Sequence, residues 1–327
     1  MKSLSVMRAV RWWSRKSFPS PSGGAPYRAA LTAALLIVAA AAPATARIKA
    51  PPQQIILDAA DPVIAVELGG QPFRLRVELG QWDVIELNPA AAARLPLAWS
   101  AGRHISVGRV TLWGRNAETR LVIEDVKRQV LVAEHGRIAA EGADGVIGPD
   151  LLPHATILWR NVAAPADTGT IVLPLRLDER TGISAPAPAL GPDMMLRFSP
   201  EADVSSGTAA AGAILAQRFD GHFAGASRPL PVLFGVTRPA RPIAFGRVPV
   251  IAGFRFPDLL VRTADFRGDN ALPAEDMEAD IVVARVERPQ GAQPWVTIGR
   301  DRLSRCAEIA YSAAPRSLTL RCAFDPG

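Results

Sequence analysis

Residues 73–97 read FRLRVELGQWDVIELNPAAAARLPL, and this stretch decides the fold of the chain. The alternation of Phe73, Leu75 and Val77 with polar residues predicts a half-buried strand that ends before Gly80. A second apolar run, VIEL, predicts another short strand. The Asn-Pro pair after it suits the N-cap and first position of an alanine-rich helix. The predicted order is therefore strand, turn, strand and capped helix.

This order resembles the active-site strand of aspartic proteases of the pepsin and retropepsin type. In that family an apolar strand runs into Asp-Thr-Gly, followed by a second strand and a small-residue helix. Here Glu78, Leu79 and Gly80 stand where the family has Asp-Thr-Gly. The scaffold thus matches the family, whereas the catalytic tripeptide does not.

A second landmark, ADGVIGPDLL at residues 143–152, resembles the family's Asp-Gly-Ile-Leu-Gly-x-Asp-Phe-Leu element. In the family this element packs beside the catalytic loop, and Ile147 with Gly148 occupies its centre. Glycine there permits close approach of two backbones. Two landmarks in the right order are more specific than either alone.

Short apolar runs rich in β-branched residues follow one another through the first half of the chain. Such runs, separated by turn residues, indicate an all-β domain. With the resemblance, they imply a mostly β protein with a two-lobed, acid-protease-like β-barrel architecture and a few short helices. The expected strands lie at 55–57, 63–66, 105–107, 110–113, 121–123, 130–132, 156–159 and 171–173.

The first-half pattern recurs in the second half, which predicts two related lobes. Residues 196–198 echo 75–77, residues 208–215 echo the alanine-rich helix, and 298–301 echo 147–150. The unequal offsets place an insertion of about 30 residues in the second lobe, at 265–280. The predicted organisation is a signal peptide at 1–46, an N-terminal lobe at 47–180, a Pro-rich linker at 181–192 and a C-terminal lobe at 193–327.

The basic character of the chain resides in its leader. Residues 1–46 hold six of the 37 Lys and Arg residues and none of the 31 acidic ones, so the remainder has 31 of each sign. A chain of 327 residues with 49% hydrophobic content can bury a sizeable core. The high overall pI therefore does not indicate nucleic-acid binding.

The leader has the pattern of an export signal, with a cationic region followed by an apolar run at 29–42 and a small-x-small motif ending at Ala46. The run is shorter than the roughly 20 residues that a membrane span needs. We expect a periplasmic or secreted protein, in contact with a membrane only through an uncleaved leader. An uncleaved anchor and a misplaced start codon remain the alternatives.

Processing after Ala46 is expected to give a mature chain that begins at Arg47, because the small residues before that bond fit signal peptidase. Terminal sequencing of the protein from the periplasmic fraction checks this prediction. An intact N-terminus recovered from the membrane fraction contradicts it.

The family's chemistry needs two carboxylates that share one proton and hold the attacking water. In the predicted register the two family positions hold Glu78 and Ser199, so the pair is missing. The sequence therefore favours an inactive homologue that binds a peptide or an envelope protein in its inter-lobe cleft. The residues expected to line this cleft are Leu79, Gly80, Ile147, Gly148, Ile298 and Gly299.

A working endopeptidase with an atypical carboxylate pair is the alternative function, and a structural scaffold is the third. Asp83 and Asp203, which precede Val in corresponding places, form one candidate pair. Asp167, in an Asp-Thr-Gly tripeptide, is another candidate carboxylate. Because an Ala-Pro segment and not an apolar strand precedes it, we interpret this tripeptide as a hairpin turn. Asp150 and Asp301 are interpreted as caps of the short helices that follow them.

The two cysteines predict one disulfide. Opposing residues of an antiparallel hairpin have a constant index sum, and Cys306 and Cys322 share their midpoint at residue 314, inside the expected turn Ala-Ala-Pro. The four His residues have no metal-ligand spacing, and no cofactor motif is present. The sequence thus implies a peptide or protein ligand, no metal, no cofactor and no particular oligomeric state.

Overall fold

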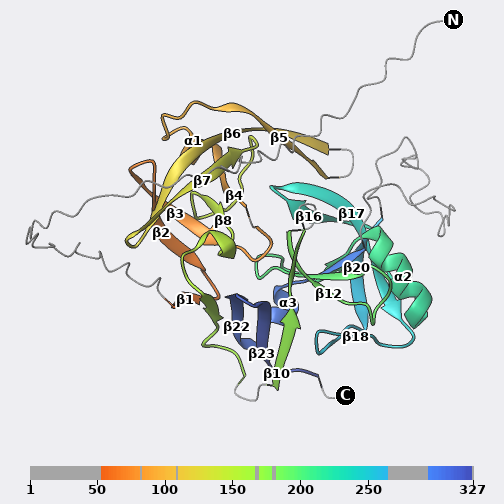
Figure 1. Ribbon diagram of the computed structural model, residues 1–327. Coiled ribbons are helices and arrows are strands. Elements are labelled where there is room, and N and C mark those ends of the chain that lie inside the picture. The colour runs from red at the N-terminus through yellow and green to blue at the C-terminus, as the bar shows by residue number, and fades with distance from the viewer. Residues whose placement is uncertain are drawn as a thin grey trace, which may run out of the picture. The chain divides into compact units, whose positions relative to one another are not determined.

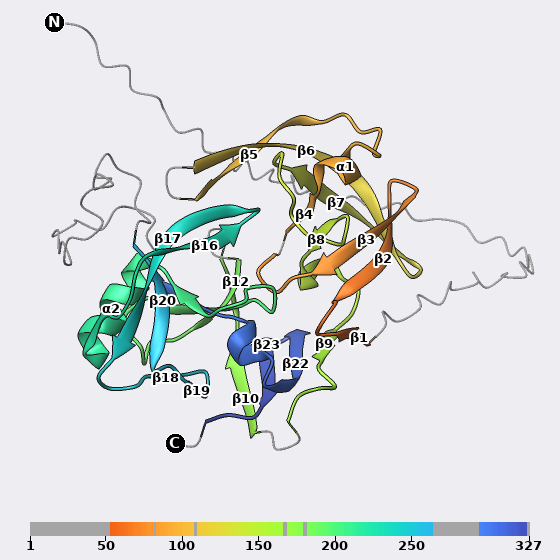
Figure 2. The same cartoon turned by 180° about the vertical axis from the view of Figure 1, so that it is seen from behind.

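The computed structural model describes residues 53–81, 83–107, 110–165, 169–178, 182–263 and 294–325, all within one compact unit, Lys49–Gly327. These residues fold mainly into strands, arranged in sheets of five, nine, two and seven strands (Figure 1, Figure 2). The protein is mostly β and two-lobed, as the sequence predicts. The leader and its expected signal peptide lie outside the described residues.

The first lobe is a seven-stranded sheet in the order β2-β3-β8-β4-β7-β6-β5, and β2 also pairs with β6, which closes the sheet into a barrel. The short helix α1 follows β4. The elements are β2 Val63–Leu68, β3 Gln71–Val77, β4 Val84–Leu87, α1 Pro89–Ala92, β5 Ser100–Val107, β6 Val110–Ile123, β7 Val126–Glu134 and β8 Gly145–Ile147. The runs expected as separate strands at 110–113 and 121–123 are the two ends of β6.

Strand β8 lies between β3 and β4, parallel to the former and antiparallel to the latter. A Cβ atom on Gly145 would lie 2.2 Å from the carbonyl oxygen of Glu86, so only glycine permits this spacing. The landmark at residues 143–152 therefore packs between the two strands that flank the first loop.

The second lobe is a nine-stranded sheet in the order β11-β12-β13-β21-β14-β20-β17-β15, with β16 paired to β17. Its elements are β11 Arg176–Asp178, β12 Gly182–Pro186, β13 Met195–Phe198, β14 Ser206–Gly207, α2 Ala209–Phe219, β15 Gly221–Phe223, β16 Arg228–Leu233, β17 Val236–Phe245, β20 Asp258–Arg262 and β21 Trp295–Ile298. Strands β18 Val250–Ile251 and β19 Phe254–Arg255 form the two-stranded sheet.

The strand arrangement of the first lobe recurs in the second. Strand β21 lies between β13 and β14, again parallel to one and antiparallel to the other. Phe198 pairs with Ile298 as Val77 pairs with Ile147. The expected insertion at 265–280 lies outside the described residues, and part of the expected linker forms β12.

A five-stranded sheet, in the order β1-β9-β22-β23-β10, joins strands from both halves of the chain. Its elements are β1 Gln54–Asp58, β9 Thr156–Arg160, β10 Gly169–Pro174, β22 Cys306–Ala313 and β23 Arg316–Cys322, with the short helices η1 Pro149–Leu151 and α3 Arg300–Leu303 preceding β9 and β22. Strands β9 and β10, which flank the tripeptide at 167–169, do not pair with each other, because β22 and β23 lie between them. Asp167 itself lies outside the described residues.

The predicted disulfide is confirmed, with an S–S distance of 1.98 Å between Cys306 and Cys322. The expected register is off by one. Ala313 pairs with Arg316 around a two-residue turn, and a register shift between Cys306 and Glu308 restores the opposition of the cysteines.

The largest apolar cluster in the core of the described residues includes residues of all three large sheets, and its largest fully buried side chains include Trp159, Tyr311 and Phe73. In the part of the chain that the structure describes, no helix has the length and apolarity needed to cross a membrane.

Candidate functional site

Two equivalent loops follow β3 and β13. The backbone N–H of Glu78 donates to the carbonyl oxygen of Ile147 at 3.0 Å, and that of Ser199 donates to Ile298 at the same distance. In each loop the amide three residues later donates back to that first residue at 3.2 Å. Glu78 and Ser199 therefore occupy matching backbone positions at the ends of matching strands.

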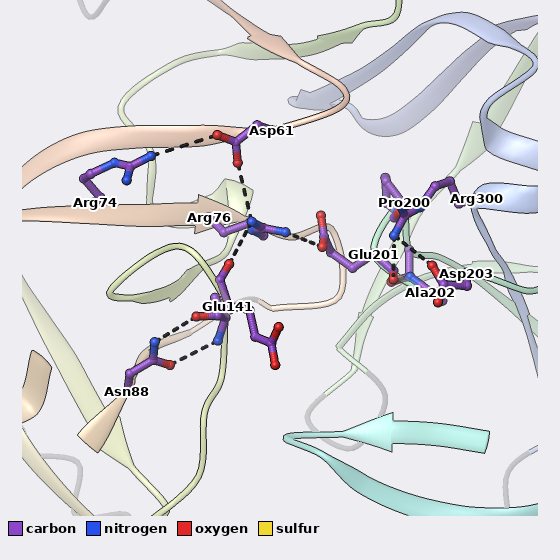
Figure 3. A network of polar contacts seen from close by, with 12 residues as sticks. Asp61, Arg74, Arg76, Asn88, Glu141, Pro200, Glu201, Ala202, Asp203 and Arg300 are labelled. Carbon is purple, nitrogen blue, oxygen red and sulfur yellow. Dashed lines mark hydrogen bonds and ion pairs between the residues drawn. The ribbon is translucent and has the colours of Figure 1, made fainter. Parts of the chain in front are cut away.

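Arg76 connects the two loops. Its Nη1 forms an ion pair with Glu201, which lies 125 positions away in the second loop (Figure 3). Its Nη2 donates to the carbonyl oxygen of Glu141 at 3.0 Å and lies 3.4 Å from Asp61 Oδ1. The guanidinium thus holds one carboxylate from each lobe and a carbonyl of the segment before β8.

Glu78 lies beside this ion pair. The pKa of Glu78 is raised to about 7, mainly by burial of the side chain. The negative charge of Glu201 adds to this rise, and the positive charge of Arg76 opposes it. Part of the Glu78 surface stays accessible, although protein surrounds most of the side chain. Between the described residues no hydrogen bond joins the carboxyl groups of Glu78 and Glu201. The raised pKa of Glu78 favours its protonated form at mildly acidic pH.

Arg300, the first residue of α3, holds the second loop from the opposite side. Its Nε donates to the carbonyl oxygen of Pro200 at 3.1 Å, and its Nη2 lies 3.0 Å from Asp203 Oδ1 (Figure 3). The Asp203 side chain is 84% exposed, so its carboxylate faces solvent. Asp83, the other member of that candidate pair, lies half-buried just before β4.

The capping roles expected for Asp150 and Asp301 are wrong, because neither η1 nor α3 has a side-chain cap. Asp150 accepts a hydrogen bond from the Tyr311 hydroxyl and pairs with Arg316 at 2.7 Å. Asp301 accepts from the amide and hydroxyl of Ser205, at 2.7 and 2.8 Å. Both carboxylates anchor neighbouring strands instead of a helix end.

Asn88 occupies the N-cap position of α1, with Pro89 next, as the sequence predicts, but its side chain does not cap the helix. Its amide oxygen accepts from the backbone N–H of Ala139 at 2.7 Å, and its Nδ2 donates to the carbonyl oxygens of Ala140 and Ala143 at 2.8 Å each. The side chain thereby fixes the segment that carries the Glu141 carbonyl to Arg76.

Five of the six residues expected to line the cleft are buried. They are Leu79, Ile147, Gly148, Ile298 and Gly299, whereas Gly80 is exposed. A Cβ atom on Gly299 would lie 2.6 Å from the backbone of Val204, so glycine is needed for close packing there. These five buried residues pack beneath the two loops. The polar groups of the site come from the partly exposed side chains of Glu78, Arg76 and Glu201.

Sequence reasoning missed Arg76 and Glu201 as site residues. Arg76 is the penultimate residue of β3, two positions before Glu78. Glu201 is the third residue of the Ser-Pro-Glu tripeptide that matches Glu78-Leu79-Gly80. Among the residues of known placement, no three His, Cys, Asp or Glu side chains are arranged to hold a metal ion.

Comparison with protein families finds no model that matches this chain, and no curated protein matches it. One solved structure that it resembles is the EIAV protease complexed with the inhibitor HBY-793. The similarity covers 28% of this chain and 84% of that one, at 14% identity and a TM-score of 0.24. The chain is thus partly similar to a retroviral aspartic protease. At this level the similarity carries no argument about activity.

Proposed function

We propose that the protein is an exported, catalytically inactive aspartic-protease-like protein that binds a peptide or an envelope protein between its lobes. The observation that carries this proposal is the matching backbone position of Glu78 and Ser199. A serine there supplies no carboxylate, so the proton-sharing pair of the family has only one of its two members.

The environment of Glu201 supports inactivity further. A carboxylate that serves as general base must be placed to accept a proton from the attacking water, whereas the carboxylate of Glu201 is engaged in an ion pair with Arg76. A carboxyl group displaced by about 1 Å can already cost on the order of a hundredfold in rate.

A second candidate function rests on the electrostatics of Glu78. Its pKa of about 7 makes it a proton donor at mildly acidic pH, and Glu201 nearby is a carboxylate from the other lobe. A protonated acid and an ionised carboxylate are the two components that an acid peptidase uses. In this alternative the pair is Glu78 with Glu201, in place of the two family positions.

The purified full chain is expected to show no cleavage of denatured casein between pH 3 and 7, and Glu78→Asp is expected to create none. One positioned acid or base contributes typically 10²- to 10⁴-fold, so loss of the pair leaves turnover below routine detection. The measurement is peptide release with and without pepstatin.

Pepstatin-sensitive cleavage that disappears in both Glu78→Gln and Glu201→Gln would establish the second candidate instead. Glu67→Gln, exposed on β2, is the matched control, and loss of cleavage in Asp203→Asn would point instead to the pair of Asp83 and Asp203. Loss of cleavage in Asp167→Asn would identify the tripeptide at 167–169 as the site.

Peptide binding has its own test, which needs no activity. A tryptic digest of casein is expected to slow amide deuterium uptake in loops 78–81 and 199–203, since an extended peptide buries backbone where it lies. Unchanged uptake in both loops at saturating digest contradicts the proposed binding.

A further inference from the structure

A buried acid and a buried histidine meet in the first lobe, away from the two loops. His135, directly after β7, places Nδ1 at 2.9 Å from Oε1 of Glu86 on β4. Glu86 is 2% exposed and His135 8%. Buried ionisable groups of this kind are costly unless they are paired, and here each is the partner of the other.

The imidazole of His135 also contacts the second lobe. The turn between β16 and β17 is Phe234-Gly235, with φ angles of 46° and 70°, as in the two-residue hairpin turns with a left-handed backbone. The Phe234 ring stacks on the imidazole, with centroids 6.1 Å apart and planes 22° apart. On β6, a Cβ atom on Gly114 would lie 2.4 Å from Nε2, so glycine is required to admit the ring.

The hairpin tip has a second, apolar contact with the first lobe. Val236 of β17 is buried in one cluster with Val107 of β5 and Leu112 of β6, and Phe234 packs against that cluster. Both views show the ends of β5 and β6 beside the β16–β17 hairpin (Figure 1, Figure 2). The tip is therefore held by an apolar contact and by the stack on His135.

We propose that the Glu86–His135 pair is a proton-dependent docking site for the tip of the β16–β17 hairpin. Glu86 and His135 share one titratable proton, and while they keep it the net charge of the pair is zero, whichever of the two residues carries it. The pair then places no net charge beneath the Phe234 ring. Loss of that proton leaves a buried carboxylate beneath the tip. The docked hairpin thus holds the proton more tightly than the undocked one.

The surrounding charges set the direction of the effect. Glu134 of β7 and Arg115 of β6 form an ion pair at 2.9 Å, and the tip residues Phe234 and Gly235 are not ionisable. Arg137, two residues after His135, is exposed. Burial raises the pKa of Glu86, and Glu134 adds to this, against the hydrogen bond and charge of His135.

The docked hairpin is expected to tolerate an extra proton on the Glu86–His135 pair better than the loss of the shared proton. A cationic His135 lies against the face of Phe234 and has Glu86 and Glu134 nearby, whereas a lone Glu86 carboxylate has the acid Glu134 for a neighbour. Raising the pH is therefore expected to undock the hairpin, and lowering it is not.

Amide hydrogen exchange of the full chain at pH 6 to 9, corrected for intrinsic exchange rates, tests the proposal. For one linked proton the opening constant of residues 228–245 rises by up to about tenfold per pH unit. The β22–β23 hairpin of the same molecule, which lies in a different sheet from Glu86 and from the strand that leads into Glu78, is the internal reference, and its opening constant is expected to stay constant.

Three variants separate the proton from the contact. Glu86→Gln keeps the acceptor for Nδ1–H without the charge, so its hairpin is expected to stay protected at every pH. Phe234→Ala loses protection at every pH, and Glu118→Gln, exposed on β6, behaves as the wild type. A wild-type hairpin whose opening does not depend on pH overturns the proposal, as does a Glu86→Gln variant that keeps the wild-type dependence.

Discussion

The Glu78→Gln variant is expected to be about 3 kcal/mol more stable than the wild type at pH 8 and nearly equal to it at pH 4. The size follows from the difference between the ordinary pKa of 4.5 and the value of about 7 that burial and Glu201 give to Glu78. Glutamine keeps the shape of the side chain and never ionises.

The sign follows from proton binding. Below pH 4.5 Glu78 is protonated in both the folded and the unfolded chain, so it adds no pH dependence. Between pH 4.5 and 7 the unfolded chain loses this proton first, and the free energy of unfolding of the wild type falls as the pH rises. Above pH 7 the full difference remains, because the folded protein then buries a carboxylate beside Glu201.

Urea denaturation of both proteins at pH 4, 6 and 8 measures the difference. Comparing variant with wild type at each pH cancels the contributions of other groups, including Glu86. Glu67→Gln, exposed on β2, is the matched control and is expected to track the wild type. A Glu78→Gln difference that is the same at pH 4 and pH 8 contradicts the assigned environment of this carboxyl group.

The parts of the fold with a local sequence signature were predictable. The alternation before Glu78, the Asn-Pro pair and the two Ile-Gly landmarks are short-range patterns, and they identified both loops and the repeat. The second-lobe strands β16 and β17 have no such signature, since Pro229 pairs with Pro239 and proline argues against a strand. These two strands still form a hairpin, because β16 pairs with β17 alone and the Phe234-Gly235 turn connects them.

The candidate site depended on information that no local pattern carries. Arg76 and Glu201 are 125 positions apart, and their contact follows from the placement of one lobe against the other. The disulfide gives a milder example. The cysteine pair was predictable from its spacing about the turn, whereas the register shift beside Cys306 that brings the two residues together was not.

Arg76→Met is expected to destabilise the protein by about 2–3 kcal/mol at pH 7, somewhat less than the 3–5 kcal/mol typical of a fully buried pair that loses one partner. The Arg76 side chain is 16% exposed and that of Glu201 28%, so water compensates part of the loss. Methionine keeps much of the apolar stem of the side chain and removes the charge.

The loss extends beyond one ion pair. Without the guanidinium, the carboxylate of Glu201 faces Glu78 without its cationic partner, and the Glu141 carbonyl loses its donor. Because Arg76 opposes the rise in the pKa of Glu78, the variant is expected to shift this pKa further upward. Its stability should therefore keep falling to a higher pH than that of the wild type.

A double-mutant cycle with Glu201→Gln isolates the contact between the lobes. Removing both charges should recover part of the stability that Arg76→Met loses, with a coupling of about 1–2 kcal/mol. Arg74→Met is the matched control, on the same strand and face, because its 3.9 Å ion pair with Asp61 is exposed on both sides and contributes little. Additive effects of Arg76→Met and Glu201→Gln on the free energy of unfolding would show that the guanidinium does not hold the two loops together. Equal losses of stability in Arg74→Met and Arg76→Met would show the same.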